Sequence, residues 1–297
     1  MNVLESSTRI AFTNILFLTD FSEASQPAME YAATLAKHHH ATFYAGHIHT
    51  PTAPLQLDGD PLMEYLDAVR EEKRKEVSRL IEPFGLNSKV LVSEGMIEYA
   101  IERWTIVHGI DLIVVGTHGW KGLERLLLGS TAELILRSAI CPVLTVGPHV
   151  AKLEHGPEYI DRILFATDLT PPSEYAVSYA LSFAHERCAH LTFLHVLGKD
   201  SHVPDHNRVM EYCEHELRGL VPSDAALWCD PEFVVTQGDA AQEILNFAEN
   251  DNSDLIVLGL PKDKVFSTHF RSGVTYSVVS SAPCPVLTVR DMLQEKR

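Results

Sequence analysis

Residues 111–131 read DLIVVGTHGWKGLERLLLGST, and the fold that we expect follows from this stretch. Its first residues form an apolar run suited to a buried strand, and its last residues begin a segment with helical character. Between the two stand three glycines at the spacing G-x2-G-x9-G, followed directly by two hydroxyl residues: Gly116, Gly119, Gly129, Ser130 and Thr131. A glycine-rich turn before a helix brings backbone N–H groups and a partial positive charge close to a phosphate. The stretch therefore predicts an α/β fold with a phosphate site.

The chain contains an internal repeat. ILFLTD at 15–20 recurs as ILFATD at 163–168, so Ile15 corresponds to Ile163 at an offset of 148 positions. CPVLTV at 141–146 recurs at 284–289, so Cys141 corresponds to Cys284 at an offset of 143 positions. Solenoid repeats have periods of roughly 20–50 residues, so a period this long indicates two copies of a whole domain.

The length of the chain agrees with two domains. A chain of 297 residues is long enough for two domains of about 100–200 residues each. The segment 148–160 is polar, contains proline and glycine, and lacks apolar periodicity, so we interpret it as a linker. We therefore expect one domain at 1–147 and a second at 161–297.

Composition excludes several classes of partner. Forty acidic and 24 basic residues give a net charge of −16, which argues against nucleic acid and against anionic membrane surfaces. No apolar stretch approaches the ~20 residues of a spanning helix, and the N-terminus lacks the features of a secretory signal. The five cysteines include no C-x-x-C pair and are typical of free thiols in a reducing compartment, so we expect a cytoplasmic protein.

Strands and helices alternate along each copy. The first copy reads as strands at 15–19, 42–48, 90–92, 112–115 and 142–146, and as helices at 25–37, within 61–83, at 97–107 and at 131–138. Alternation of this kind indicates parallel β-α-β units with right-handed crossovers. Continuous apolar strands indicate a sheet that is covered on both faces. The predicted fold is α/β, with two tandem, doubly wound, five-stranded parallel sheets.

Ligands of such sheets bind beyond the carboxyl ends of the strands, where the strand order reverses. Thr19 and Asp20 follow the first strand, and the glycine loop follows the fourth. Asp20 would then accept a hydrogen bond from a ribose hydroxyl or an adenine amine. The alternative is that Asp20 caps the following helix, and Ser130 and Thr131 are open to the same interpretation.

The sequence resembles the universal stress proteins in their tandem-domain form. The resemblance rests on TDFS at 19–22, on the G-x2-G-x9-G-[ST] motif and on both CPVLTV endings, and it covers 10–147 and 160–290. It implies a Rossmann-like fold with strand order 3-2-1-4-5, related to the adenine nucleotide α-hydrolases. It also implies that members with the full motif bind ATP and that members without it do not.

The resemblance assigns a binding role to ten positions of the first copy. The nucleoside would meet Thr19, Asp20, Ile48 and Val115, and the phosphates would meet Gly116, His118, Gly119, Gly129, Ser130 and Thr131. The implied cofactor is ATP, with or without Mg²⁺. We assign no catalytic residue and no metal ligand of the protein.

The second copy departs from the motif. Lys262 replaces the second glycine, Pro261 lacks an N–H donor, and Ser272 stands where Gly129 would recur, with Gly273 one position late. The basic side chains of this segment could still attract an anion, so nucleotide binding in the second copy stays open. We expect one working site and one degenerate site.

Other residues have simpler interpretations. His38, His39 and His40 end a helix, and His47 and His49 share one face of a strand. Metal binding would need further ligands at suitable spacing, so solvated or packing roles are favoured. No Ser/His/Asp order, H-E-x-x-H or P-loop motif is present.

Three classes of function fit the sequence. The first is a stress-response module in which nucleotide occupancy regulates conformation or partner binding. The second is a nucleotide α-hydrolase-type enzyme or slow ATPase, and the third is a nucleotide-free interaction scaffold.

The two CPVLTV strands would end each sheet at an edge, and an apolar edge favours strand pairing. We therefore expect the two domains to pair with each other and any homodimer to use a further surface.

Overall fold

A computed structural model describes residues 10–49, 59–117, 128–148, 150, 160–199, 206–260 and 273–290. Contacts between Cα atoms divide the chain into two compact units, one mainly Phe12–Leu123 with Gly129–Val143 and the other mainly Leu144–Arg297. Among the helices in these ranges, none is long and apolar enough to cross a membrane.

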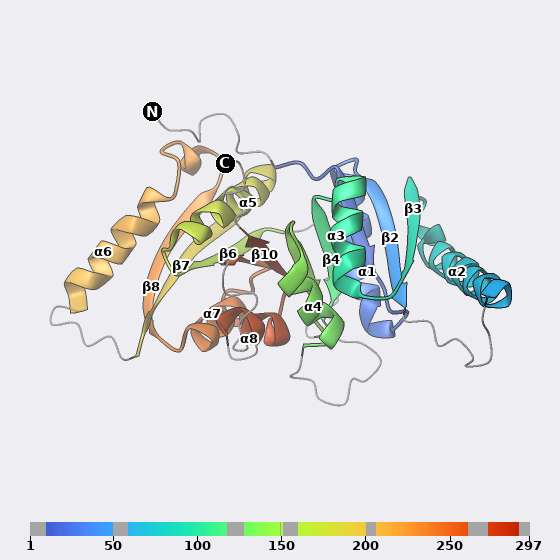
Figure 1. Ribbon diagram of the computed structural model, residues 1–297. Helices are drawn as coiled ribbons and strands as arrows, with labels where there is room; N and C mark the ends of the chain where they lie inside the picture. The colour runs from blue at the N-terminus through green and yellow to red at the C-terminus, as the bar shows by residue number, and fades with distance from the viewer. Residues whose placement is uncertain are drawn as a thin grey trace, which may run out of the picture. The chain divides into compact units, whose positions relative to one another are not determined.

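The first repeat is built from alternating strands and helices (Figure 1). Its strands are β1 (Asn14–Leu18), β2 (Thr42–His49), β3 (Ser88–Glu94), β4 (Leu112–Gly116) and β5 (Val143–Val146). Its helices are η1 (Glu23–Ser25), α1 (Gln26–His38), α2 (Gly59–Ile81), η2 (Glu82–Phe84), α3 (Ile97–His108) and α4 (Ser130–Ser138). The strand order is β3-β2-β1-β4-β5, as predicted, and the pairs β1–β2, β1–β4 and β2–β3 are parallel.

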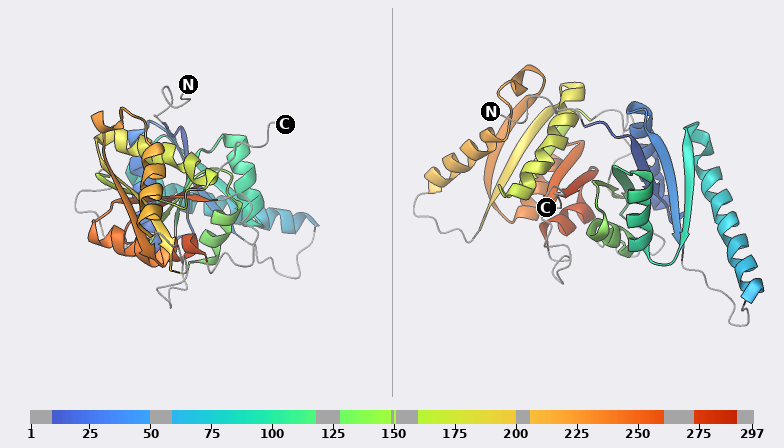
Figure 2. Two further views of the ribbon diagram at one scale, coloured as in Figure 1. Left: turned by 90° about the vertical axis from the view of Figure 1, so that its left-hand side faces the viewer. Right: turned by 45° about the horizontal axis from the view of Figure 1, so that its top comes forward.

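The second repeat has the same architecture (Figure 2). Its strands are β6 (Arg162–Thr167), β7 (His190–Gly198), β8 (Asp230–Gly238), β9 (Leu255–Leu260) and β10 (Val286–Arg290). Its helices are α5 (Pro171–Arg187), α6 (His206–Gly219), η3 (Ala225–Leu227), α7 (Ala240–Asn250) and α8 (Val274–Ser281). The strand order is β10-β9-β6-β7-β8, and the pairs β6–β7, β6–β9, β7–β8 and β9–β10 are parallel.

The core of each repeat consists of the central strands and the helix faces that cover them. β1 and β4 are almost continuously buried, because right-handed crossovers place α1 and α2 on one face of the sheet and α3 and α4 on the other. The face of α1 that packs on the sheet is apolar, and these residues of it are all buried: Ala28, Tyr31, Ala32, Leu35 and Ala36. α3 ends at His108, and its C-cap is Gly109, whose φ of 60° suits a residue without a side chain.

The repeated aspartates at the start of β4 and β9 have a structural role. The Asp111 carboxylate accepts hydrogen bonds from the N–H groups of Thr13 (2.7 Å) and Asn14 (3.1 Å). Asp254 accepts from the N–H groups of Asp161 and Arg162, both at 2.9 Å. Each aspartate therefore fixes the beginning of the neighbouring strand, at the edge of the sheet opposite the carboxyl ends.

Candidate functional site

Strand register brings the predicted site residues of the first repeat to one edge of the sheet. Leu18 of β1 aligns with Val115 of β4 and with Gly46 of β2. Thr19 and Gly116 each follow by one residue, so they stand level at the carboxyl edge. This is the point where the order of the strands reverses, because β1 lies between β2 and β4.

The turn after β1 is held by its own side chains. Phe21 has a φ of 64°, which is unusual for a residue with a side chain. The Phe21 N–H donates to Thr19 Oγ1 (2.9 Å), and the Ser22 N–H donates to Asp20 Oδ1 (3.0 Å). Asp20 is therefore a turn residue, and the N-cap of α1 is Ser25.

Thr19 is buried and fully engaged with the protein. Its hydroxyl lies 3.3 Å from Ser25 Oγ, and its N–H donates to the backbone oxygen of Gly46 (3.0 Å). Its own carbonyl oxygen accepts from Nδ1 of His47 at 2.8 Å. These contacts show that the Thr19 side chain orients the turn and the start of η1.

His47 is a residue of this edge that the sequence did not single out for the site. Burial lowers the pKa of its imidazole, although the hydrogen bond to the Thr19 carbonyl raises it. Because a carbonyl only accepts, Nδ1 carries the proton in this contact. The ring lies 4.5 Å from the Phe21 ring and stacks on His49 at 5.8 Å. The available signal was its recurrence as His195, whose Nδ1 contacts the Thr167 oxygen at 2.9 Å.

Gly116 is required by packing. A Cβ atom at this position would lie 3.0 Å from the backbone oxygen of Ala24 and 3.3 Å from the Cα of Ser25. Because both are backbone atoms, they cannot move aside as a flexible side chain would. The first glycine of the motif therefore allows β4 to approach η1 closely, whatever else it contacts.

The glycine loop rejoins the fold at the start of α4. The Gly129 N–H donates to the carbonyl of Thr117 at 2.7 Å, which ties the two described ends of the loop together. Gly129 is the N-cap of α4 and has an ordinary φ of −58°. The first helical bond runs from the Glu133 N–H to the Gly129 carbonyl (2.9 Å), so the three preceding N–H groups have no acceptor within the helix.

The hydroxyl residues of the motif lie at this helix start. Ser130 and Thr131 are the first two residues of α4, and both are exposed. Neither of them is the N-cap, so the capping alternative for these two residues is wrong. On the strand side, Val115 is buried and Ile48 is half-buried. His118 and Gly119 lie outside the described residues.

The second repeat reproduces the turn but not the helix start. Leu169 has a φ of 59°, and its N–H donates to Thr167 Oγ1 at 3.0 Å. The Thr170 N–H donates to Asp168 Oδ1 at 3.1 Å. Gly273 is the N-cap of α8, as Gly129 is of α4, and α8 begins with Val274. The offset of 143 holds from Gly116 to Ala139, so Gly273 and Val274 replace Ser130 and Thr131, and α8 begins one residue later in the repeat than α4.

The segment 261–272, which contains Pro261, Lys262 and Ser272, lies outside the described residues.

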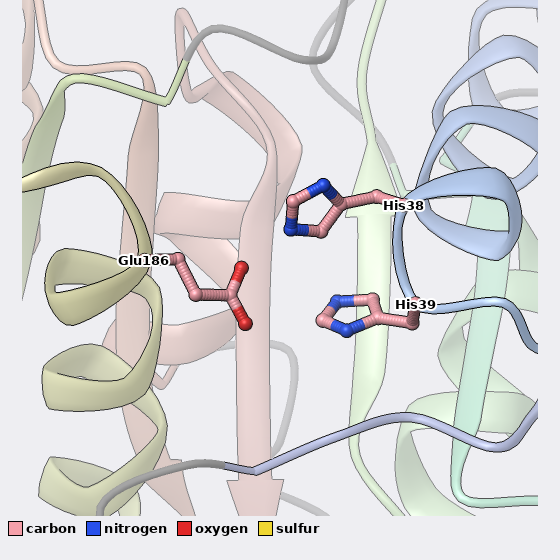
Figure 3. Close-up of side chains that lie close together, drawn as sticks. All are labelled: His38, His39 and Glu186. Atoms are coloured by element: carbon pink, nitrogen blue, oxygen red, sulfur yellow. The ribbon is translucent and has the colours of Figure 1, made fainter.

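The histidines at the end of α1 pack with aromatic rings. The ring of His39 lies edge-on to Phe12 at 5.2 Å and to His38 at 5.0 Å. Figure 3 draws these two histidines with Glu186, which belongs to the other compact unit, and we assign no metal site to them.

A model of the Universal stress protein family matches residues 11–147 and 160–290. The chain belongs to this family. Universal stress protein MJ0531 of Methanocaldococcus jannaschii is 34% identical over 139 residues, which are 46% of this chain and 82% of the relative. A universal stress protein of Mycolicibacterium smegmatis is 26% identical over 293 residues, which are 93% of this chain and 96% of the relative.

A solved structure extends this similarity to the fold. The universal stress protein from Archaeoglobus fulgidus DSM 4304 matches with a TM-score of 0.70 and 22% identity, covering 96% of this chain and 99% of the other. The predicted fold class and the family resemblance are confirmed. The ATP-binding subclass stays a prediction.

Proposed function

We propose that the first repeat binds ATP at the carboxyl edge of β1 and β4, and that nucleotide occupancy regulates conformation or partner binding in a stress response. The observation that carries the proposal is the start of α4, where the last glycine of the motif, Gly129, is the N-cap of the helix. Its N–H groups and the exposed hydroxyls of Ser130 and Thr131 are the donors that a phosphate needs.

The proposal assigns different tasks to the two sides of the site. Asp20 supplies an acceptor for a ribose hydroxyl or an adenine amine, and Ile48 and Val115 supply apolar contact to the base. Thr19 acts by holding the turn, because its hydroxyl already contacts the Phe21 N–H and Ser25. Together with Ser130 and Thr131, the residues proposed to contact the phosphates are Gly116, His118, Gly119 and Gly129.

Any Mg²⁺ in this proposal is held mainly by the phosphates. The side chains at the start of α4 are hydroxyls and not the carboxylates that Mg²⁺ prefers. Glu133, the acidic residue of the first turn, is buried, and its Oε1 lies 3.7 Å from Arg137 Nη1. Nucleotide and metal are therefore expected to bind together, and the metal alone weakly.

We expect one nucleotide per chain. Only the first repeat combines the G-x2-G-x9-G spacing with hydroxyl residues at the helix start, whereas α8 begins with Val274. Calorimetric titration of the full chain with ATP should give a stoichiometry close to one, and mass spectrometry of the denatured protein should identify any adenine nucleotide that copurifies. Two equivalent sites, or no binding at millimolar ATP, would contradict the proposal.

We also propose that the two repeats pair through their final strands. β5 and β10 carry the same CPVLTV sequence, and their apolar residues are buried. Aspartate at Val143 or Thr145 should therefore loosen the pairing, and limited proteolysis should cut the 148–160 segment faster than in the unmodified chain. The proposal is wrong if this segment is cut equally fast in both and the fragments separate on a sizing column.

A further inference from the structure

The outer face of α3 in the first repeat is apolar and exposed. Tyr99, Ile106 and Val107 are 66–68% exposed, and Met96, at the helix start, is 60% exposed. Single exposed apolar residues are common, but several on one helix face mark an interaction surface. We call Met96, Tyr99, Ile106 and Val107 the α3 outer face (Figure 1 shows α3).

These residues are not the part of α3 that packs on the sheet. The buried residues of the helix are Ala100, Ile101, Trp104 and Thr105. At about 100° per residue, they centre on the side opposite Tyr99 and Ile106. α3 is therefore apolar on two opposite sides, and its own repeat covers only one of them.

The second repeat shows that the fold does not require this apolar face. α7 is the equivalent helix, displaced by 143 positions. The residues that stand in place of the α3 outer face are all polar: Asp239, Gln242, Glu249 and Asn250. Its buried residues Ile244 and Ala248 match Ile101 and Thr105, so the two helices pack on their sheets in the same way. The apolar character of the outer face is a property of the first repeat alone.

Charge on the same face indicates what covers it. Arg103 lies within the apolar strip at helical spacing, and Glu102 lies at its margin; both side chains are exposed. Neighbours in sequence on a helix do not face each other, so these two do not pair with one another. Neither forms an ion pair with any other residue in the described ranges. A second copy of the same face offers apolar residues together with an acidic and a basic group, so it can cover the apolar residues and pair with both charges.

We propose that the α3 outer face is the homodimer interface of this protein, formed with α3 of a second copy of the chain. A two-fold axis between positions 102 and 103 makes the helices antiparallel. It sets Tyr99 opposite Ile106 of the second copy and Glu102 opposite its Arg103. In this arrangement apolar side chains face apolar side chains and each charge faces an opposite charge. The face is thus complementary to itself, as an isologous interface requires. Tyrosine and arginine are also the residue types that most often dominate binding energy.

Analytical ultracentrifugation of the full chain tests the proposal. The unmodified protein should be a dimer at micromolar concentration, and Ile106→Glu should weaken dimerisation by at least about tenfold, since it removes a central contact. The substitution is compatible with the helix, because Glu249 occupies the same position in α7. The matched control is Asn250→Glu in α7, at the position of Val107, which should leave the dimer unchanged.

An exchange of charges tests the geometry of the axis. Arg103→Glu should weaken the dimer, because Glu102 of the second copy then meets a like charge. The double variant Glu102→Arg/Arg103→Glu should restore it. A monomeric unmodified chain would overturn the proposal and leave the face to a different protein. Dimerisation that is insensitive to Ile106→Glu, or that the double variant fails to restore, would overturn it as well.

Discussion

Gly129→Asp is expected to abolish ATP binding by the first repeat while leaving α4 at least as stable as before. Aspartate is a preferred N-cap residue, and the φ of −58° at Gly129 suits any residue. The gain in helix stability should be a few tenths of a kcal/mol to about 1 kcal/mol. The same carboxylate occupies the N–H groups proposed for the phosphate and repels its charge. At about 4 Å and an effective dielectric constant of 20 the repulsion is about 4 kcal/mol, roughly a thousandfold in Kd.

The second repeat supplies the control for this substitution. Gly273 is the N-cap of α8, so Gly273→Asp makes the same chemical change at the start of the equivalent helix. It should leave ATP binding unaltered in calorimetric titration, and both variants should unfold at or above the urea concentration that the unmodified chain requires. Unchanged affinity in Gly129→Asp would mean that the phosphates do not meet α4. Loss of binding in Gly273→Asp would mean that the second repeat contributes to the site.

The order of elements was predictable because the strands of a covered parallel sheet are apolar along their whole length. β1 and β4 differ from the expected 15–19 and 112–115 by a single residue at their ends. β3 was expected only at 90–92 but spans Ser88–Glu94. It is an outermost strand of the sheet order, where polar and exposed residues replace the apolar run, so hydrophobicity alone could not show its ends.

The strand positions of the candidate site residues were predictable, but the contacts of their side chains were not. The sequence predicted that Thr19 and Gly116 lie at the same edge of the sheet. The register of β1 and β4 confirms this, because Leu18 pairs with Val115. The sequence could not show that the Thr19 hydroxyl is engaged with the turn, because this contact depends on the left-handed backbone of Phe21. Nor could spacing show that Gly273 is the N-cap of α8, because the offset of 143 aligns it with Ser130 and α8 begins one residue later than α4.

The two repeats fill the space between β2 and α3, or β7 and α7, in different ways. A Cβ atom at Gly46 would lie 2.9 Å from Leu18 Cδ2, 2.9 Å from the Trp104 ring and 3.1 Å from Leu16 Cδ1. In the second repeat the equivalent positions of Gly46, Leu18 and Trp104 are Leu194, Ala166 and Phe247. A larger residue on the second strand is thus matched by smaller residues on the first strand and on the helix.

Gly46→Leu is therefore expected to destabilise the first repeat strongly. The new side chain must enter a space that Leu18 and Trp104 already occupy, and both are buried. Inserting carbon atoms into a filled core costs about 1–3 kcal/mol and sometimes more. Urea unfolding of the full chain should show the loss as a lower midpoint for the first repeat, with the transition of the second repeat unchanged.

Combining this change with Leu18→Ala provides the decisive comparison. Leu18→Ala alone should cost about 2–5 kcal/mol, because it leaves a cavity at a buried position. The double variant reproduces the Leu194 and Ala166 pair of the second repeat, so each substitution should compensate for part of the other. We expect a favourable coupling of about 1–3 kcal/mol, and Trp104→Phe should add to it. Additive losses would show that Gly46 is required for a reason other than the volume of its neighbours.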